Sequence, residues 1–208
     1  MDKKEVKLNI GCGIRLVKDF INVDKYIRLE DLLHGEKTKQ GIYANAKVEE
    51  GAEFIQGDIL DLPFEDNYAD YILCVDVIEH IRMREVPKAL SELYRVLKPG
   101  GKMTMMTTDF DDLVDIWNEL RKKPFDVDKY LDVVEIIYGN QAGFGEAELH
   151  KSAFNADFLN LSLQTAGFKK YELTGYKRGS LHPIMGGYFK EVEGRALRSS
   201  MFVVNATK

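Results

Sequence analysis

The stretch Leu8-Asn9-Ile10-Gly11-Cys12-Gly13 decides the fold of this chain. It continues an apolar run that begins at Val6, and two glycines end that run. A short apolar run bounded by a turn signal predicts a buried strand. The glycines predict a turn whose backbone can approach a ligand closely, because glycine has no Cβ and tolerates positive φ. A tight turn without a ligand would fit these six residues equally well, so the rest of the sequence has to separate the two interpretations.

Apolar runs and helical periodicities elsewhere predict an alternation of strands and helices. Besides the first strand, strands are predicted at residues 20–23, 53–56, 68–75, 102–107, 168–174 and 201–205. Helices are predicted at residues 86–97, in two pieces within 110–138, and from Asn155 to Gly167. This order indicates an α/β fold with a seven-stranded, mostly parallel sheet and helices on both faces. No helix is predicted between the last two strands, so they should form a terminal antiparallel hairpin.

The length of the chain and the spacing of these elements predict one domain with a lid. A chain of 208 residues suffices for one sizeable core and contains no repeat or Pro/Gly-rich linker, so residues 1–208 are expected to form a single domain. Three long connections, at residues 25–52, 108–153 and 176–199, would all leave the carboxyl edge of the parallel strands. Extra chain at that edge is typical of a lid over a ligand, here a largely helical one.

Charge and cysteine content narrow the class of protein. The net charge of −5 and the pI near 5.5 give no general basic surface for nucleic acid or for an anionic membrane. No stretch is long and apolar enough for a membrane span, and residues 1–5 lack the apolar core of a signal peptide. Cys12 and Cys74 lie in apolar runs, as buried thiols of a reducing compartment do. We therefore expect a cytoplasmic protein, and leave its oligomeric state open.

Two carboxylates follow the next two predicted strands and separate the two interpretations of the glycine turn. Asp24 ends the second strand, where it could accept hydrogen bonds from a ribose diol. The run Gly57-Asp58-Ile59-Leu60 ends the third strand and offers an acceptor for an adenine amino group beside an apolar contact for its ring. Either aspartate alone could be a turn or cap residue. The presence of both aspartates at successive strand ends, after a glycine turn, favours a nucleoside-binding site.

In their order, these motifs resemble class I S-adenosylmethionine-dependent methyltransferases of the small-molecule type. The resemblance covers residues 6–107, with a plausible tail from residue 153 onward. It is carried by Leu8-Asn9-Ile10-Gly11-Cys12-Gly13, Ile21-Asn22-Val23-Asp24, Gly57-Asp58-Ile59-Leu60-Asp61-Leu62-Pro63-Phe64, Tyr71-Ile72-Leu73-Cys74-Val75-Asp76-Val77-Ile78-Glu79-His80 and Arg95-Val96-Leu97-Lys98-Pro99-Gly100-Gly101.

The resemblance implies S-adenosylmethionine as the cofactor and assigns residues to its parts. Gly11, Cys12 and Gly13 would lie along its methionine part, and Asp24 would hold the ribose hydroxyls. Asp58 and Ile59 would hold the adenine, and Cys74 would lie on the side of the pocket where the methyl group is transferred.

Two departures from the family pattern carry expectations of their own. Asn9 stands where the family often has an acidic residue; its amide oxygen could accept from the cofactor's ammonium group, without the added attraction of opposite charge. Only six residues separate Gly13 from Phe20, too few for the usual helix, so we expect a single turn there. The rival dinucleotide-binding oxidoreductases require a third glycine, where this chain has Leu16, and a crossover helix. Neither requirement is met.

The reaction implied by the family is methyl transfer to a small polar acceptor, for which we favour oxygen. The protein then has to align acceptor and donor, and an oxygen acceptor also needs a general base. His80, directly after the fourth strand, and His150, before the last helix, are the candidates for that base. The alternatives are a cofactor-binding partner subunit without catalytic activity and a protein that interacts with partners through its lid.

A divalent cation is a further alternative at the same place. In a helix, Asp76, Glu79 and His80 would share one face, and His150 could reach them. Such ligands could bind a cation that orients and acidifies an acceptor hydroxyl. The arrangement resembles metal-assisted 2′-O-methyltransferases that act on RNA ends, which have Glu in place of Asp76, although the acidic chain argues against RNA. Glu-His after the fourth strand also occurs in metal-free relatives, as a helix start and pocket wall, so the sequence leaves the metal ligands unknown.

Overall fold

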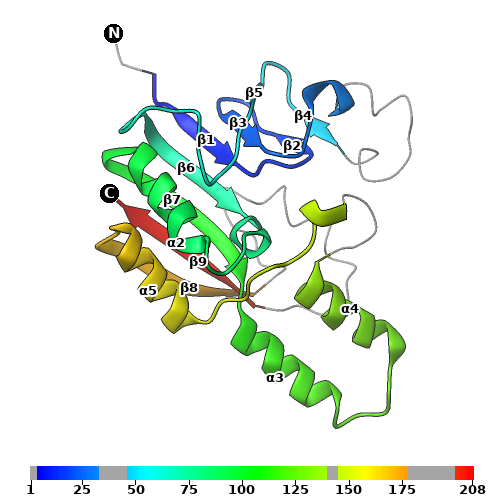
Figure 1. The fold of residues 1–208 in the computed structure, drawn as a ribbon. Helices are drawn as coiled ribbons and strands as arrows, with labels where there is room; N and C mark the ends of the chain where they lie inside the picture. Colours follow the sequence, from blue (N-terminus) through cyan, green and yellow to red (C-terminus); the bar gives the residue numbers. More distant parts are fainter. Residues whose placement is uncertain (1–3, 33–45, 140–144, 178–199) are drawn as a thin grey trace.

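A seven-stranded sheet runs through the computed structural model, which describes residues 4–32, 46–139, 145–177 and 200–208. Its strands lie in the order β5-β3-β1-β6-β7-β9-β8 (Figure 1). The first five of these are parallel, and β9 is antiparallel to both of its neighbours. This confirms the predicted α/β fold with a terminal antiparallel hairpin. The strands are β1 (Lys7–Ile10), β3 (Ile21–Asp24), β5 (Glu53–Gln56), β6 (Ala69–Val75), β7 (Leu97–Thr108), β8 (Lys170–Lys177) and β9 (Ser200–Thr207).

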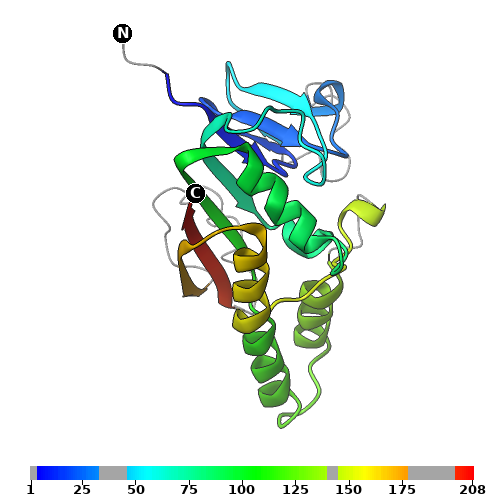
Figure 2. The same cartoon turned by 60° about the vertical axis from the view of Figure 1, so that its left-hand side comes forward.

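Two helices, α2 (Val86–Val96) and α5 (Ala156–Ala166), lie side by side over one face of the sheet (Figures 1 and 2). Their apolar residues and those of the sheet form the main core. Helix α5 begins where the sequence predicts it, because the side chain of Asn155 accepts a hydrogen bond from the Phe158 N–H. It ends at Gly167, whose φ of 110° lies in the left-handed region that glycine adopts readily.

The connection between β1 and β3 contains no helix, which agrees with its short length. Instead of the expected single turn, it forms the two-residue strand β2 (Arg15–Leu16), paired with β4 (Lys47–Val48) in a separate small sheet. Buried Asn22 holds this connection: its amide oxygen accepts from the Val17 N–H, and its amide nitrogen donates to the Val17 carbonyl, both at 2.9 Å. A second small core forms here from Cys12, Leu16, Ile27 and Leu32, the last in a helix that begins at residue 29.

Helices α3 (Phe110–Leu120) and α4 (Val127–Tyr138) form a hairpin that extends beyond the carboxyl edge of the sheet (Figures 1 and 2). The break near Pro124 lies between them, as the sequence predicts. All three long connections leave from this edge, because β3, β7 and β8 end there. Parts of these connections, at 33–45, 140–144 and 178–199, lie outside the described residues, so the lid remains a prediction. None of the helices in the described part of the chain has the length and apolar character needed to cross a membrane.

Candidate functional site

A cavity of about 580 Å³ opens at the carboxyl edge of β1, β3 and β6. We call the part of its wall made by Gly11–Gly13, Asp24 and Asp58 the glycine end. His80 and Lys151 line other parts of the same cavity. They belong to two segments, residues 78–80 and 149–152, which we call the histidine end. The cavity therefore brings together six of the eight residues that the sequence assigns to the cofactor and one of the two candidate bases.

The glycine turn follows directly from the end of β1. Gly11 and Gly13 have φ values of +68° and +53°, in the left-handed region. A Cβ on Gly11 would lie 2.3 Å from Cγ2 of Val77, whereas a Cβ on Gly13 would meet no atom within 4 Å. Position 11 therefore requires glycine both for its backbone conformation and for close packing, and position 13 keeps open space at the cavity wall.

Asp24 is the acceptor of the glycine end that receives three backbone hydrogen bonds. One carboxylate oxygen accepts from the Gly13 N–H at 2.9 Å, and the other accepts from the Tyr26 and Ile27 N–H groups at 2.8 and 3.0 Å. The backbone thus fixes the carboxylate between the turn and the next connection. Because a carboxylate has about four lone-pair sites, these three bonds leave room for a further donor from the cavity.

Asp58 lies at the end of the neighbouring strand and also lines the cavity. Its carboxylate accepts from the Leu60 N–H at 3.0 Å and forms an ion pair with Lys25 at 2.8 Å. Partial burial raises the pKa of Asp58, but the bonds from Lys25 and Leu60 outweigh that effect, so its pKa lies below the ordinary value. Ile59, only 6% exposed, adds apolar wall beside this negative charge.

Three further residues that the sequence assigns to the cofactor are buried, and only one of them reaches the cavity. Cys12 lines the cavity as a buried thiol whose pKa is raised by burial, so it stays protonated at neutral pH. Cys74 belongs to the main core instead of the cavity wall, and burial raises its pKa too. Asn9 does not line the cavity either. Its amide nitrogen donates to Asn22 at 2.9 Å, so Asn9 helps to hold the short connection after β1.

At the histidine end, the chain leaves β6 through a single three-residue turn, η2 (Ile78–His80). The expected α-helical face that would include Asp76 does not form, since Asp76 precedes this turn with a φ of 53°. Glu79 points inward and is 2% exposed, and its carboxylate accepts a hydrogen bond from the Thr107 hydroxyl at 3.1 Å. Asp76 and the buried Glu79 therefore do not share one face of a helix.

A segment far along the chain is bound to η2 by its backbone. The Lys151 and Ser152 N–H groups donate to the Glu79 carbonyl at 2.7 and 3.1 Å. The Ser152 hydroxyl donates to the Ile78 carbonyl at 3.0 Å. These bonds fix the segment that follows η3 (Gly145–Ala147), and with it the position of His150.

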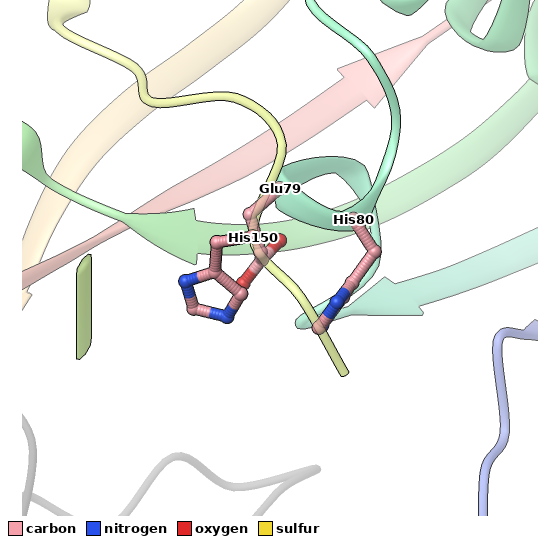
Figure 3. Close-up of side chains that lie close together, drawn as sticks. All are labelled: Glu79, His80 and His150. Atoms are coloured by element: carbon pink, nitrogen blue, oxygen red, sulfur yellow. The ribbon is translucent and has the colours of Figure 1, made fainter. Parts of the chain in front are cut away.

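The two candidate bases, His80 and His150, lie next to each other and to Glu79 (Figure 3). Their ring centroids are 4.8 Å apart. Nδ1 of His80 lies 3.3 Å from the Leu149 carbonyl, and Nδ1 of His150 lies 2.8 Å from the Ile136 carbonyl. A carbonyl only accepts, so each Nδ1 carries a hydrogen. Burial lowers the pKa of His80, which favours the neutral ring with an acceptor at Nε2.

Sequence reasoning missed three residues of this end. Thr107 and Ser152 hold Glu79 and its turn, and Glu148 lines the cavity. One oxygen of the Glu148 carboxylate is buried and has no hydrogen-bond partner among the described residues, and burial raises its pKa. No motif or periodicity marks these three residues, because their roles depend on contacts with distant parts of the chain.

Comparison with known proteins agrees with this architecture. The family model described as a methyltransferase domain matches residues 8–105. The chain is 32% identical over 146 residues to an uncharacterised protein of Methanocaldococcus jannaschii, covering 66% of this chain and 58% of that protein. It is also 32% identical over 150 residues to a demethylmenaquinone methyltransferase of Staphylococcus carnosus, covering 68% and 56%. The chain thus spans less than two thirds of either relative's length.

A similar fold occurs in a solved structure, a SAM-dependent methyltransferase from Methanosarcina mazei. The two share 15% sequence identity, with a TM-score of 0.58 over 99% of this chain and 93% of the other. The family match to residues 8–105 and the strand order of the whole sheet lead to the same assignment. Residues 8–105 therefore carry a methyltransferase domain, and the sheet has the fold of S-adenosylmethionine-dependent methyltransferases.

Proposed function

We propose that the cavity binds S-adenosylmethionine and that the protein transfers its methyl group to a small polar acceptor, with oxygen favoured over nitrogen or carbon. The observation that carries this proposal is the glycine end, where the turn and the carboxylates of Asp24 and Asp58 face one cavity. The volume of about 580 Å³ lies within the range of small-molecule sites.

The residues of the glycine end fit the chemistry of this cofactor. Asp24 has room to accept from ribose hydroxyls, and Asp58 offers an acceptor to the adenine amino group beside the apolar wall of Ile59. The backbone from Gly11 to Gly13 would lie along the methionine part. Asn9 and Cys74 are left out of this set because neither lines the cavity. When bound, S-adenosylmethionine supplies an electrophilic methyl group on a sulfonium.

His80 is the candidate general base for an oxygen acceptor. It lines the cavity, and its Nδ1–H bond to the Leu149 carbonyl makes Nε2 the ring nitrogen that can accept a proton. Its lowered pKa keeps it neutral at physiological pH, so it can take the hydroxyl proton as the acceptor oxygen bonds to carbon. His150 does not line the cavity, and would act on the acceptor only through His80.

The segment from 108 to 153 supplies a cover for the acceptor. Glu148 and Lys151 from this segment line the cavity, and α4 holds His150 through the Ile136 carbonyl. A movement of the α3–α4 hairpin would therefore change the histidine end and leave the glycine end in place. This supports a lid that closes over the acceptor.

Calorimetry with S-adenosylmethionine and with S-adenosylhomocysteine tests the proposal. We expect saturable binding of both to the folded chain. Folded protein that binds neither would contradict the proposed function. Binding without methyl transfer to any member of a panel of hydroxyl and amine acceptors would instead favour a cofactor-binding partner subunit.

A further inference from the structure

We infer that Glu79, His80 and His150 form a binding site for one divalent transition-metal ion, with two imidazoles and one carboxylate as ligands. Each of the three side chains offers one donor atom, and these three atoms all lie within 4.8 Å of one another. Glu79 is almost fully buried. Donors on one metal ion at bond lengths of about 2.0–2.2 Å lie about 3–3.5 Å apart, so small rotations of the side chains would complete the site. Figure 3 shows the three side chains in this arrangement.

The hydrogen bonds behind both rings select the tautomer that a metal requires. Nδ1 of His80 is directed to the Leu149 carbonyl and Nδ1 of His150 to the Ile136 carbonyl. Each ring is therefore oriented by a backbone acceptor, with Nε2 as its donor atom to a metal. A bond from the second ring nitrogen to a carbonyl or carboxylate is the usual support of a metal-binding histidine.

The carboxylate has a corresponding support. The Thr107 hydroxyl donates to one oxygen of Glu79, which orients the carboxylate as a hydrogen bond behind a metal ligand does. The backbone bonds from Lys151 and Ser152 to the Glu79 carbonyl join the two segments that carry the ligands. The site is thus held together although its ligands come from positions 79, 80 and 150.

The donor set indicates which metals would bind. Two neutral imidazole nitrogens and one carboxylate suit Mn²⁺, Fe²⁺, Co²⁺ or Zn²⁺, whereas Mg²⁺ and Ca²⁺ prefer oxygen donors. Three protein ligands leave coordination positions open, and His80 places the ion beside the cavity wall. If the proposed function holds, an acceptor hydroxyl would occupy an open position and be acidified there, and His80 would serve as ligand instead of base.

Titration of the full chain with Co²⁺, after removal of metals by a chelator, tests this site. We expect one equivalent to bind, with visible absorption bands of a cobalt ion coordinated by nitrogen and oxygen, and with no comparable binding of Mg²⁺. Affinity should fall as the pH decreases through the range where imidazole is protonated, since proton and metal compete for Nε2. Glu79→Gln and His150→Gln should each weaken Co²⁺ binding at least about 10-fold. His182→Gln, at a histidine outside the described residues, is the matched control.

Circular dichroism of each variant and calorimetry with S-adenosylmethionine in the presence of chelator separate the possible failures. Folded wild-type protein that binds the cofactor but none of Co²⁺, Mn²⁺ and Zn²⁺ would overturn the metal site and leave the proposed function standing. Co²⁺ binding that survives unchanged in folded Glu79→Gln and His150→Gln would overturn the ligand assignment. Metal binding without cofactor binding would support the site while contradicting the proposed function.

Discussion

The glycine end and the histidine end of the cavity are built from different kinds of contact. At the glycine end, Asp24 is held by N–H groups of Gly13, Tyr26 and Ile27, all within eleven positions of it. At the histidine end, the bonds that hold η2 come from Leu149 and Ser152, about 70 positions away. One end is fixed by local backbone geometry, and the other by the docking of a distant segment.

This difference has a consequence for stability and for binding. Changes at the glycine end should disturb the strand ends and the cofactor together, because the same backbone groups serve both. Changes at the histidine end should loosen the docked segment while the sheet below it persists, as expected where few long-range bonds hold a segment.

Gly11→Ala should have the largest effect. Its φ of +68° is unfavourable for alanine, and the new Cβ would overlap Cγ2 of Val77 at 2.3 Å. Together these should lower the free energy of unfolding by about 3 kcal/mol. Urea denaturation followed by circular dichroism measures the change.

Gly13→Ala is the matched comparison, because its φ of +53° is also left-handed but a Cβ there meets no atom within 4 Å. It should lower the free energy of unfolding by about 1 kcal/mol. Adding Val77→Ala to Gly11→Ala should restore the part of the unfolding free energy that is lost through overlap with the Val77 side chain. Equal losses for the two glycine variants would show that close packing against Val77 is not what requires Gly11.

Asp24→Asn tests the cofactor role of the glycine end. The amide loses the negative charge and one of the two acceptor oxygens, so binding of S-adenosylmethionine should weaken about 30-fold, or about 2 kcal/mol. Calorimetry on protein verified as folded measures this. Asp115→Asn, at an exposed position of α3, should bind like the wild type. An unchanged dissociation constant for Asp24→Asn would remove Asp24 from the binding site.

Acid should weaken the two ends in different pH ranges. Burial lowers the pKa of His80 in the folded chain. As the pH falls, His80 is therefore protonated in the unfolded chain at a higher pH than in the folded chain. Stability should therefore decrease from about pH 6.5 downward, by at most about 1.4 kcal/mol per pH unit for this one group. The lowered pKa of Asp58 instead contributes stability that is lost only when the pH falls below about 4.

Unfolding curves at a series of pH values, in the presence of chelator, check this order. His80→Asn keeps an N–H near the position of Nδ1 but has no titratable group. Its stability should depend less on pH between about 6.5 and 5 than that of the wild type. The same slope in both proteins would show that other groups cause the acid sensitivity.

The glycine end could be predicted from the sequence because its signals are local. A turn after an apolar run and an aspartate after the next strand follow from spacing alone, since parallel strands end at one edge. Asn9 has a structural role that the sequence did not indicate. The short connection to β3 leaves backbone groups that need partners, and Asn22, oriented by Asn9, supplies them. That need is not visible in a family pattern of acidic residues.

At the histidine end, the sequence suggested that His150 could reach Glu79 and His80, but it also placed Asp76 in the same group. Helical spacing put Asp76 with Glu79 and His80, whereas the chain makes only one short turn there and directs Glu79 inward. The adjacency of His150 depends on the docked segment, and the support from Thr107 joins residues 28 positions apart. Spacing within one element cannot indicate such contacts.

Ser152→Ala should have one of the smallest effects, and it tests the docking of the distant segment directly. The variant removes the bond from the Ser152 hydroxyl to the Ile78 carbonyl at 3.0 Å, while the bond from its N–H to the Glu79 carbonyl remains. The free energy of unfolding should fall by about 1 kcal/mol, the net contribution of a single hydrogen bond. Binding of S-adenosylmethionine should stay unchanged, because the glycine end does not depend on this bond.

Ser91→Ala provides the control, since the Ser91 hydroxyl donates to the Pro87 carbonyl at 2.8 Å within helix α2 and is exposed. Alanine favours the helix, so this variant should be as stable as the wild type or slightly more so. Hydrogen exchange of the Lys151 and Ser152 N–H groups then separates local from global effects. Faster exchange there in Ser152→Ala, with β1 and β3 unchanged, is expected if the segment opens alone. Equal acceleration in the sheet would mean that both ends unfold as one unit and that the contrast between them does not hold.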